Sequence, residues 1–393
     1  MNFSITDNQK EICSTILKMS ESQLNKNIFK HDEESYFPRE KWDLCCRSDI
    51  LALPISEKDG GLGQDMLTTA LAIKSLAYSC KDEGLIFALC AHLCTCLIPI
   101  YFFGTEEHKA KYLPKLISGE QIGGNGITET ESGSDITGLR THVKKNENNY
   151  TLNGSKIFVT NGPVADVLII YARHSNGIPM ADTSAFIIEA QNRGLKIGQT
   201  YKKMGLRTST ISEILLEDCG IPLENLLGRE RLGLLVFNKS MLWERIIMAA
   251  YHIGSMEQQF NTVFEYANIR KQFGKEIIRF QNISDKIIEM RMRIETSRLL
   301  LYQCCWKYDC DEIKLSDASM LKLYVAEAKV QNSLDAVQIF GAYGYMKESI
   351  VEKQLRDSIA AKIYSGTSEI QKLIILENLG KIDGMLKREG TQS

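Results

Sequence analysis

The sequence predicts an α+β protein in which a helical part, a β-rich part and a second helical part follow one another. Apolar residues recur every three or four positions from Ile5 to about Leu116, and this period returns in long segments from about Gly233. Between these parts the apolar residues alternate. Strands and helices do not alternate as βαβ units, which argues against a doubly wound nucleotide-binding sheet. The predicted domains are residues 1–121 (helical), 122–232 (β-barrel-like) and 233–393 (a helical bundle).

The helical period of the first domain is clear in "DMLTTALAIKSLAYSC" and "EEHKAKYLPKLISG", and Gly-rich segments such as "EKDGGLGQD" separate the helices. In the middle domain, "NYTLNGSKIFVTNG" contains two alternating runs joined at Asn153-Gly154, which is a strong hairpin signal. We expect further strands at "DVLIIYAR", "SAFIIEA" and "ISEILLEDCGI". In the last domain the helical segments are long and the connections short, which favours a bundle of four or five helices.

Composition excludes several classes of function. The net charge of -2 comes from 47 basic and 49 acidic residues mixed along the chain, so nucleic acid is not an expected partner. The N-terminus lacks the apolar stretch of a signal peptide, and we expect no later apolar run long enough to span a membrane; the predicted location is cytoplasmic. Eleven cysteines without a paired CxxC pattern indicate reduced, packed thiols, and no metal site is expected. No GxGxxG motif follows a strand.

Three segments are rich in Gly, Ser and Thr. In "NGITETESGSDITG" small residues can bring N–H groups and hydroxyls close to an anion, although a solvated loop has the same composition. In "IFVTNG" the aromatic ring of Phe158 precedes the hydroxyl of Thr160 at the end of a predicted strand. Taken alone, this segment is also consistent with an ordinary strand. In "IYSGTSEIQ" the small residues interrupt a helical pattern and either cap the next helix or direct its N–H groups at a ligand.

Glu244 stands out because the surrounding segment, "MLWERIIMAAYHIG", is otherwise suited to burial. A buried carboxylate needs compensation, since desolvation disfavours its charged form. A structural ion pair and a catalytic base are both consistent with this pattern. Arg245 is not expected to be the simple partner, because adjacent residues on a helix do not face each other.

Together with "NIRKQFGKEI" and "QIFGAYGY", the three segments resemble the acyl-CoA dehydrogenase superfamily along essentially the whole chain. The resemblance implies a helical domain, a β domain and a four-helix bundle, with FAD bound between domains and reaching a neighbouring subunit. It places Thr128, Thr160 and Phe158 at the flavin ring, Ser134 at the pyrophosphate, and Thr367 and Glu369 near FAD. From the partner subunit it implies Arg270, Gln272, Phe273, Gln338 and Gly341. Ala342 and Phe158 depart from the family's frequent Gly and Trp.

The family's reaction needs a base that removes the α-proton of an acyl thioester. Many members carry a Glu before Gly-Thr, but here Ser365 stands before Gly366, and a serine hydroxyl cannot act as this base unaided. A minority of the family carries the catalytic Glu on the first bundle helix, at the position of Glu244. The resemblance thus implies that Glu244 is the base, that the Ser365 N–H holds the substrate carbonyl, and that Arg245 shapes the pocket.

Several segments, among them "SMLWERI" and "LRDSIAAKIYSGTSEIQ", look most similar to the branch of the family that oxidises prolyl groups on carrier proteins in secondary metabolism. The implied substrate is L-prolyl on the phosphopantetheine arm of an acyl or peptidyl carrier protein. The implied partners are copies of this chain, as a dimer or tetramer, and an electron acceptor, either electron-transfer flavoprotein or oxygen. Two alternatives remain: a short- or branched-chain acyl-CoA dehydrogenase, and a non-catalytic flavin-binding scaffold.

Overall fold

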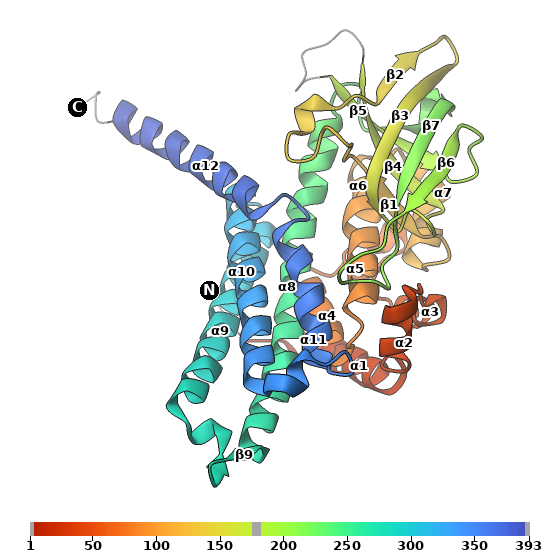
Figure 1. The fold of residues 1–393 in the computed structure, drawn as a ribbon. Helices are drawn as coiled ribbons and strands as arrows, with labels where there is room; N and C mark the ends of the chain where they lie inside the picture. The colour runs from red at the N-terminus through yellow and green to blue at the C-terminus, as the bar shows by residue number, and fades with distance from the viewer. Residues whose placement is uncertain (1–3, 175–181, 390–393) are drawn as a thin grey trace.

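The computed structural model describes residues 4–174 and 182–389, and it confirms the predicted order of helices, sheet and helices (Figure 1). The helical elements of the first part are α1 (Asp7–Gln23), α2 (Ile28–Glu34), α3 (Arg39–Cys46), α4 (Met66–Ser79), α5 (Glu83–His92), a π-helical turn (Leu93–Leu97), α6 (Ile98–Phe103) and α7 (Glu106–Ile117). Several begin at side-chain caps; the Asp65 carboxylate, for example, accepts the Thr68 N–H at the start of α4.

The middle part forms one mixed sheet in the order β6-β7-β3-β2-β4-β5-β8, with β1 added parallel to β4. Its strands are β1 (Gly123–Gly126), β2 (His142–Lys145), β3 (Asn149–Thr160), β4 (Val167–His174), β5 (Thr183–Glu189), β6 (Leu195–Thr200), β7 (Ile211–Pro222) and β8 (Leu226–Leu227). The sheet encloses a core of its own, which includes Leu152, Ile170, Phe186 and Ile214.

The predicted hairpin at Asn153-Gly154 is wrong. Residues Asn149–Thr160 form one continuous strand, and the register against β7 shifts between Leu152 and Gly154. Gly154 has a φ of +146° and lies against Thr141, where a Cβ atom would come within 2.6 Å of the Thr141 hydroxyl. The Asn-Gly pair therefore marks a bulge that lets a neighbouring segment approach the strand closely, and not a turn.

The last part is a bundle of long helices, with a two-stranded ribbon at one end (Figure 1). Its elements are α8 (Gly233–Ile269), β9 (Lys271–Gln272), β10 (Lys275–Glu276), α9 (Gln281–Asp309), α10 (Leu315–Phe340), α11 (Ile350–Ile359) and α12 (Ser368–Glu389). Helix α12 projects away from the body of the molecule in Figure 1. Helix α8 packs extensively against both α4 and α10 and so joins the first part of the chain to the bundle.

The expectation that no apolar run is long enough to span a membrane is wrong. The helical segment Glu83–Phe103 is 21 residues long with a mean hydropathy of 2.1. Of its most apolar window, 89% is buried inside the protein, where it packs against α8 and the sheet. Its composition is thus explained by a place in the core of the fold, between the two larger units.

Candidate active site

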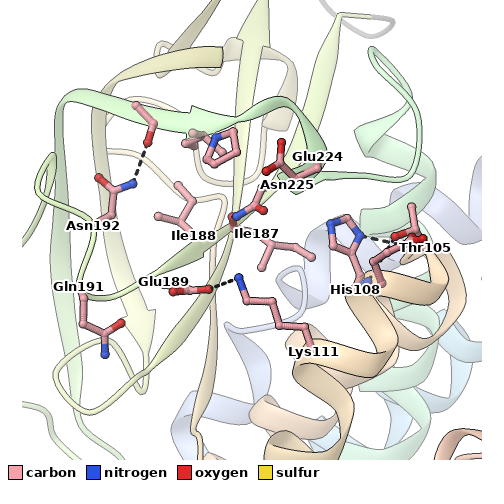
Figure 2. A pocket seen from close by; sticks show the side chains of 14 residues that line it. Thr105, His108, Lys111, Ile187, Ile188, Glu189, Gln191, Asn192, Glu224 and Asn225 are labelled. Carbon is pink, nitrogen blue, oxygen red and sulfur yellow. Dashed lines mark hydrogen bonds and ion pairs between the residues drawn. The ribbon is translucent and has the colours of Figure 1, made fainter. Parts of the chain in front are cut away.

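A surface groove of about 780 Å³ lies between helix α7 and strands β5 and β7 (Figure 2). Polar side chains line much of it, among them His108, Lys111, Glu189 and Asn192, and the Lys111 ammonium pairs with the Glu189 carboxylate at 2.6 Å. None of the residues predicted to carry chemistry lines this groove. Those residues lie in three other groups, and helix α8 carries residues of two of them.

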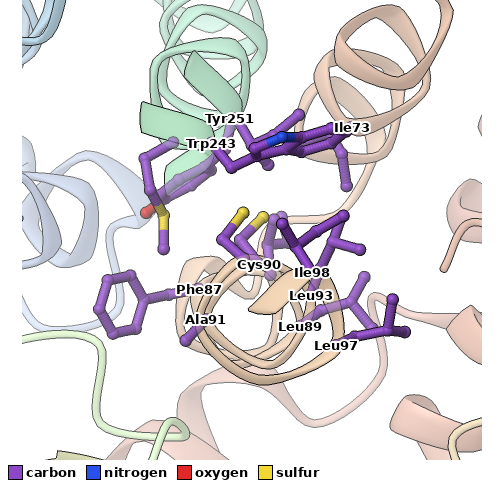
Figure 3. Close-up of a cluster of buried hydrophobic side chains, with 14 of the residues drawn as sticks. Ile73, Phe87, Leu89, Cys90, Ala91, Leu93, Leu97, Ile98, Trp243 and Tyr251 are labelled. Atoms are coloured by element: carbon purple, nitrogen blue, oxygen red, sulfur yellow. The ribbon is translucent and has the colours of Figure 1, made fainter. Parts of the chain in front are cut away.

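Glu244 is buried in α8, with only 6% of its surface exposed. Figure 3 shows Trp243 and Tyr251 of α8 packed against the helical segment that carries Cys90, and Glu244 is close enough to the Cys90 and Cys94 thiols to raise their pKa values. Burial raises the pKa of Glu244 to about 7, an effect that Ser365, Arg245 and Lys322 only partly offset. The carboxyl group is therefore close to half-ionised at neutral pH, which is the condition that suits a general base.

The turn Ser365–Gly366 lies beside Glu244 and has an unusual backbone. Both residues have positive φ angles, +55° and +86°. Three side chains hold their carbonyl oxygens: Arg245 Nε donates to Ser365 at 3.3 Å, Lys322 Nζ donates to Gly366 at 2.7 Å, and Gln371 Nε2 donates to both, at 3.0 and 2.8 Å. Helices α8, α10 and α12 thus fix the turn from three sides, which is how a strained backbone persists.

The Ser365 hydroxyl is buried and makes no hydrogen bond of standard geometry within the described ranges, but it lies close enough to the Glu244 carboxyl group to lower its pKa. In the same ranges the Ser365 N–H meets no acceptor. With both carbonyls of the turn already occupied, the N–H is a donor that a bound molecule can use. A backbone N–H beside a buried carboxylate is an arrangement suited to proton abstraction next to a carbonyl group.

The residue before this turn, Tyr364, is also held in place. Its hydroxyl shares a hydrogen bond with His252 Nε2, and its ring packs against Phe87 with centroids 4.8 Å apart. Burial lowers the pKa of His252 to about 3, so this pair stays neutral at physiological pH. The contacts fasten the start of the turn to α8 and α5.

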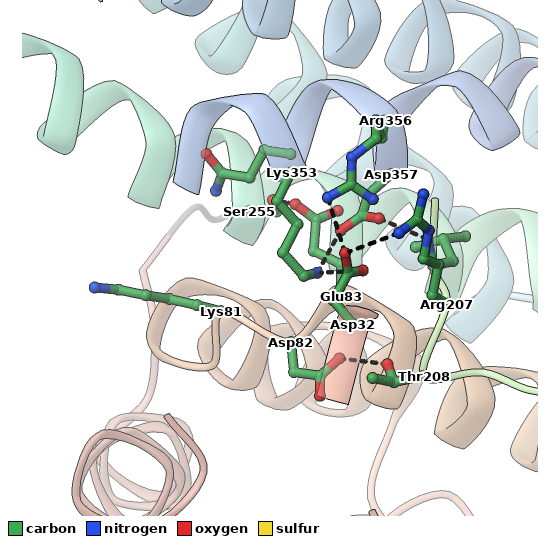
Figure 4. Close-up of polar contacts among 12 residues, drawn as sticks. Asp32, Lys81, Asp82, Glu83, Arg207, Thr208, Ser255, Lys353, Arg356 and Asp357 are labelled. Carbon is green, nitrogen blue, oxygen red and sulfur yellow. Dashed lines mark hydrogen bonds and ion pairs between the residues drawn. The ribbon is translucent and has the colours of Figure 1, made fainter. Parts of the chain in front are cut away.

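A buried ionic network anchors the helix that leads into the turn (Figure 4). In α11, Lys353 pairs with Asp357 at 2.7 Å, and Arg356 reaches Asp32 of α2 at 2.8 Å. The Asp357 carboxylate also accepts the Leu206 N–H from the loop between β6 and β7, at 2.6 Å. Removing one partner of a buried ion pair lowers the free energy of unfolding far more than an exposed ion pair raises it. This network therefore holds α11 firmly against the first two domains.

A second group of predicted residues lies at the end of β3. Phe158 is 56% exposed despite its aromatic side chain and has a φ of +55°, and its ring lies 5.1 Å from that of Tyr201. Thr160 is half-buried two positions later. Thr128 is half-buried on the neighbouring segment, where its carbonyl accepts the Ile157 N–H at 2.9 Å. The structure thus brings the Thr128 segment against the strand end that carries Phe158, and Phe158 and Tyr201 form an exposed aromatic face there.

Helix α5 connects this second group to Glu244. The residue after Thr160, Asn161, donates from Nδ2 to the Ala88 carbonyl of α5 at 3.0 Å and to the Gly123 carbonyl at 3.1 Å. Cys90 of the same helix is close enough to Glu244 for the carboxylate to raise the pKa of its thiol, which burial raises further. Ser134 is exposed, near the 3₁₀ turn that follows Asp135.

The remaining predicted residues are divided between two places. Thr367 lies at the start of α12, where its Oγ1 accepts the Ile370 N–H at 3.4 Å, and Glu369 is exposed two positions later. The third group is exposed at the far end of the bundle, around the stacked rings of Tyr266 and Phe340, whose centroids are 4.1 Å apart. Its members are Arg270, Gln272, Phe273, Gln338 and Gly341.

The third group is too distant to share one small ligand with Glu244 of the same chain. Arg270 ends helix α8, 26 positions after Glu244, which corresponds to about 39 Å at the rise of an α-helix. Thr128, Phe158, Ser365 and their neighbours therefore form one region of the chain, and the Arg270 region forms another.

Sequence reasoning missed Lys322 and Gln371, which hold the turn. The lysine within the apolar segment "MLKLYVAEA" was a possible signal, because a lysine side chain is rarely buried unless a polar group binds its ammonium. Gln371 gave no such signal, since a polar residue in the first turns of a helix is ordinary.

Comparison with known proteins covers all three parts of the chain. Family models described as acyl-CoA dehydrogenase N-terminal, middle and C-terminal domains match residues 6–120, 124–219 and 231–380. An L-prolyl-[peptidyl-carrier protein] dehydrogenase of Serratia sp. is 38% identical over 97% of this chain and 98% of its own length.

Two solved structures are also similar. The prolyl acyl carrier protein oxidase AnaB has a TM-score of 0.93 and 40% identity, covering 96% of this chain and 100% of its own. PigA with FAD and proline has a TM-score of 0.94 and 38% identity, covering 97% and 99%.

Proposed function

The chain belongs to the acyl-CoA dehydrogenase family, and on this basis we propose that it oxidises an L-prolyl group held as a thioester on a peptidyl carrier protein, with FAD as cofactor. Relatives 38–40% identical over almost the whole chain carry out, by their names, this type of reaction. The observation that carries the proposal is the buried Glu244 carboxyl group, with a pKa of about 7, beside the Ser365–Gly366 turn.

The end of β3 fits the cofactor. Phe158 and Tyr201 offer an exposed aromatic face, and the half-buried Thr128 and Thr160 lie on the same stretch of structure, Thr160 two positions after Phe158 and Thr128 bonded through its carbonyl to Ile157. A flat ring system with a polar edge, such as isoalloxazine, needs this combination. When bound, FAD accepts the hydride that leaves the β-carbon of the substrate.

Glu244 takes the α-proton in this reaction. The electron pair of the broken C–H bond forms the double bond between the α- and β-carbons, and the proton goes to the Glu244 carboxylate. Because burial raises its pKa toward neutrality, the carboxylate is basic enough to accept the proton and is still ionised in a substantial fraction of molecules. The product is a dehydroprolyl thioester.

The Ser365 N–H binds the thioester carbonyl oxygen, on which negative charge develops as the proton leaves. A well-placed donor of this kind stabilises the transition state by about 3 kcal/mol. Its position is fixed because Arg245, Lys322 and Gln371 hold the two carbonyls of the turn. Arg245 and Lys322 also add positive charge near the developing enolate.

The protein functions as a homo-oligomer, a dimer or a tetramer. The distance of about 39 Å along α8 supports this, because Arg270, Gln272, Phe273, Gln338 and Gly341 can contact a cofactor only at the centre of another subunit. Ser134, Thr367 and Glu369 complete the proposed contacts to FAD. The electron acceptor is electron-transfer flavoprotein or oxygen, and the location is the cytoplasm.

Incubation with substrate tests the function directly. Carrier protein loaded with L-proline on its phosphopantetheine arm is mixed with the purified protein, and mass spectrometry follows the loss of two or four hydrogens. Bleaching of the flavin by this substrate, and not by isovaleryl-CoA or butyryl-CoA, is the expected result. Bleaching only by a CoA ester would instead assign a short- or branched-chain acyl-CoA dehydrogenase, and no reaction with any thioester would indicate a scaffold.

A further inference from the structure

Lys322 is a buried lysine in the middle of α10, with 4% of its surface exposed. Its ammonium group donates to the Gly366 carbonyl at 2.7 Å. Among the side chains that the structure describes, in residues 4–174 and 182–379, no carboxylate lies within 4.0 Å of it. Burying a cation without an ion pair is unfavourable, so the position calls for an explanation beyond packing.

Of the four other lysines that the structure describes as buried, Lys41 donates to the Lys26 carbonyl at 2.5 Å, and three have a carboxylate partner. Lys156 meets Glu129 at 2.5 Å, Lys329 meets Glu83 at 2.9 Å, and Lys353 meets Asp357 at 2.7 Å. Each of these three residues can be understood as half of a structural ion pair. Lys322 instead directs its charge at the backbone of the turn beside Glu244.

The charged groups around Lys322 come from three helices. Arg245 and Glu244 face it from α8, Glu327 lies on α10 itself, and Glu369 belongs to α12. Glu327 is already engaged, by the Lys362 ammonium at 2.8 Å and the Ser368 hydroxyl at 2.9 Å. Burial first, and Arg245 next, lower the pKa of Lys322 to about 8, so the group is mainly protonated at neutral pH and close to losing its proton above it.

We infer that Lys322 is a positioning residue for the reaction: it fixes the Gly366 carbonyl so that the Ser365 N–H points at the substrate carbonyl. Its positive charge also favours the ionised form of Glu244. This inference rests on the proposed function for the meaning of the N–H, but the contact and the charge are features of the chain itself. Gln371 also binds the Gly366 carbonyl, at 2.8 Å. A variant that lacks the ammonium can therefore keep the turn folded while the turn loses its rigidity.

Two variants test the inference, Lys322→Met and Lys322→Arg, with Lys362→Met as the matched control. Lys362 lies nearby and is also a cation, but it contacts Glu327 and not the turn. In Lys322→Met we expect kcat for prolyl-carrier protein to fall about 100-fold, as for a misplaced reacting group, with KM changed much less.

The acid limb of the pH–rate profile should move to higher pH, because the cation that favours ionised Glu244 is gone. Lys322→Arg should restore most of kcat, and Lys362→Met should behave as the unaltered chain.

Hydrogen–deuterium exchange of the peptide covering residues 363–371 provides a readout that needs no substrate. We expect faster exchange there in Lys322→Met and unchanged exchange in Lys362→Met. Unchanged exchange together with an unmoved acid limb would overturn the inference. If the unaltered protein oxidises no prolyl thioester but exchange still rises in Lys322→Met, the proposed substrate is wrong while the positioning of the turn by Lys322 stands.

Discussion

The guanidinium of Arg245 donates to the carbonyl oxygen of Ser365 at 3.3 Å and so joins helix α8 directly to a turn 120 positions further along the chain. Glu244 precedes Arg245, and Ser365 occupies the position at which many acyl-CoA dehydrogenases carry their base. The two positions are thus neighbours in space. Under the proposed function, a carboxylate at either position would reach the same substrate atom, so the base could change its place in the sequence without a change of fold.

Replacing Glu244 tests the base. Glu244→Gln keeps the size of the side chain but cannot accept a proton, so we expect the rate of flavin reduction by prolyl-carrier protein to fall about 10²- to 10⁴-fold. Bound FAD should be retained. Stopped-flow absorbance under anaerobic conditions measures the rate, and Glu265→Gln, at an exposed position of the same helix, is the control. Full reduction at the original rate would show that another group removes the proton.

The pH dependence of kcat/KM should report the same group. Burial raises the pKa of Glu244 from its ordinary value of 4.5 to about 7. Only the ionised form is a base, so activity should be high above pH 7 and fall about tenfold for each pH unit below it. Steady-state rates between pH 5 and about pH 8 measure this limb. A limb centred near 4.5 would mean that the reacting carboxyl group is exposed to solvent.

Ser365 should act through its backbone and not its hydroxyl. The hydroxyl makes no hydrogen bond of standard geometry among the described residues and acts only to lower the pKa of Glu244 somewhat, and alanine tolerates the φ of +55° about as well as serine does. Ser365→Ala keeps the backbone donor, so we expect kcat to change by less than about threefold and the pKa of Glu244 to rise slightly. Steady-state kinetics with the loaded carrier protein measure the effect. A loss comparable to that of Glu244→Gln would assign the hydroxyl a direct part in proton transfer.

The buried pair of Lys156 and Glu129 should matter mainly for stability. Its atoms lie 2.5 Å apart, and the Glu129 carboxylate also accepts the N–H groups of Arg140 and Thr141. Lys156→Met leaves Glu129 charged and buried, so the free energy of unfolding should fall by about 3 to 5 kcal/mol. Urea unfolding followed by circular dichroism measures the change.

Lys144→Met is the control for that experiment, because Lys144 is exposed on the adjacent strand β2. Its effect should stay within about 0.5 kcal/mol. Equal effects of the two variants would show that the ion pair contributes nothing particular to the fold.

The order of helices and strands could be predicted from the sequence because the hydrophobic period changes clearly near residues 122 and 233. The hairpin at Asn153-Gly154 could not be excluded, since the same dipeptide serves a tight turn and a bulge. Only the approach of Thr141, a residue from outside the strand, decides between the two.

For the site, Glu244 was recognisable because a carboxylate is unusual in an apolar helix, and Ser365 because the family pattern lacks its acid there. The partners of the turn were not recognisable. Lys322 and Gln371 lie on two other helices, and their function depends on how α10 and α12 pack, which local patterns do not describe. The boundaries at residues 121 and 232 and the roles of the FAD contacts remain predictions.

Helix α8 runs from Gly233 past Glu244 to its C-cap at Arg270, so in the proposed oligomer one rigid helix would contribute residues to two separate active centres. A subunit with Glu244 replaced still supplies an intact Arg270 to the active centre of its neighbour. A subunit with Arg270 replaced still has an intact Glu244 in its own active centre. Mixing Glu244→Gln with Arg270→Ala protomers should therefore regenerate some fully competent centres from two inactive parents. Such complementation makes heterozygous mixtures of these alleles more active than either one alone.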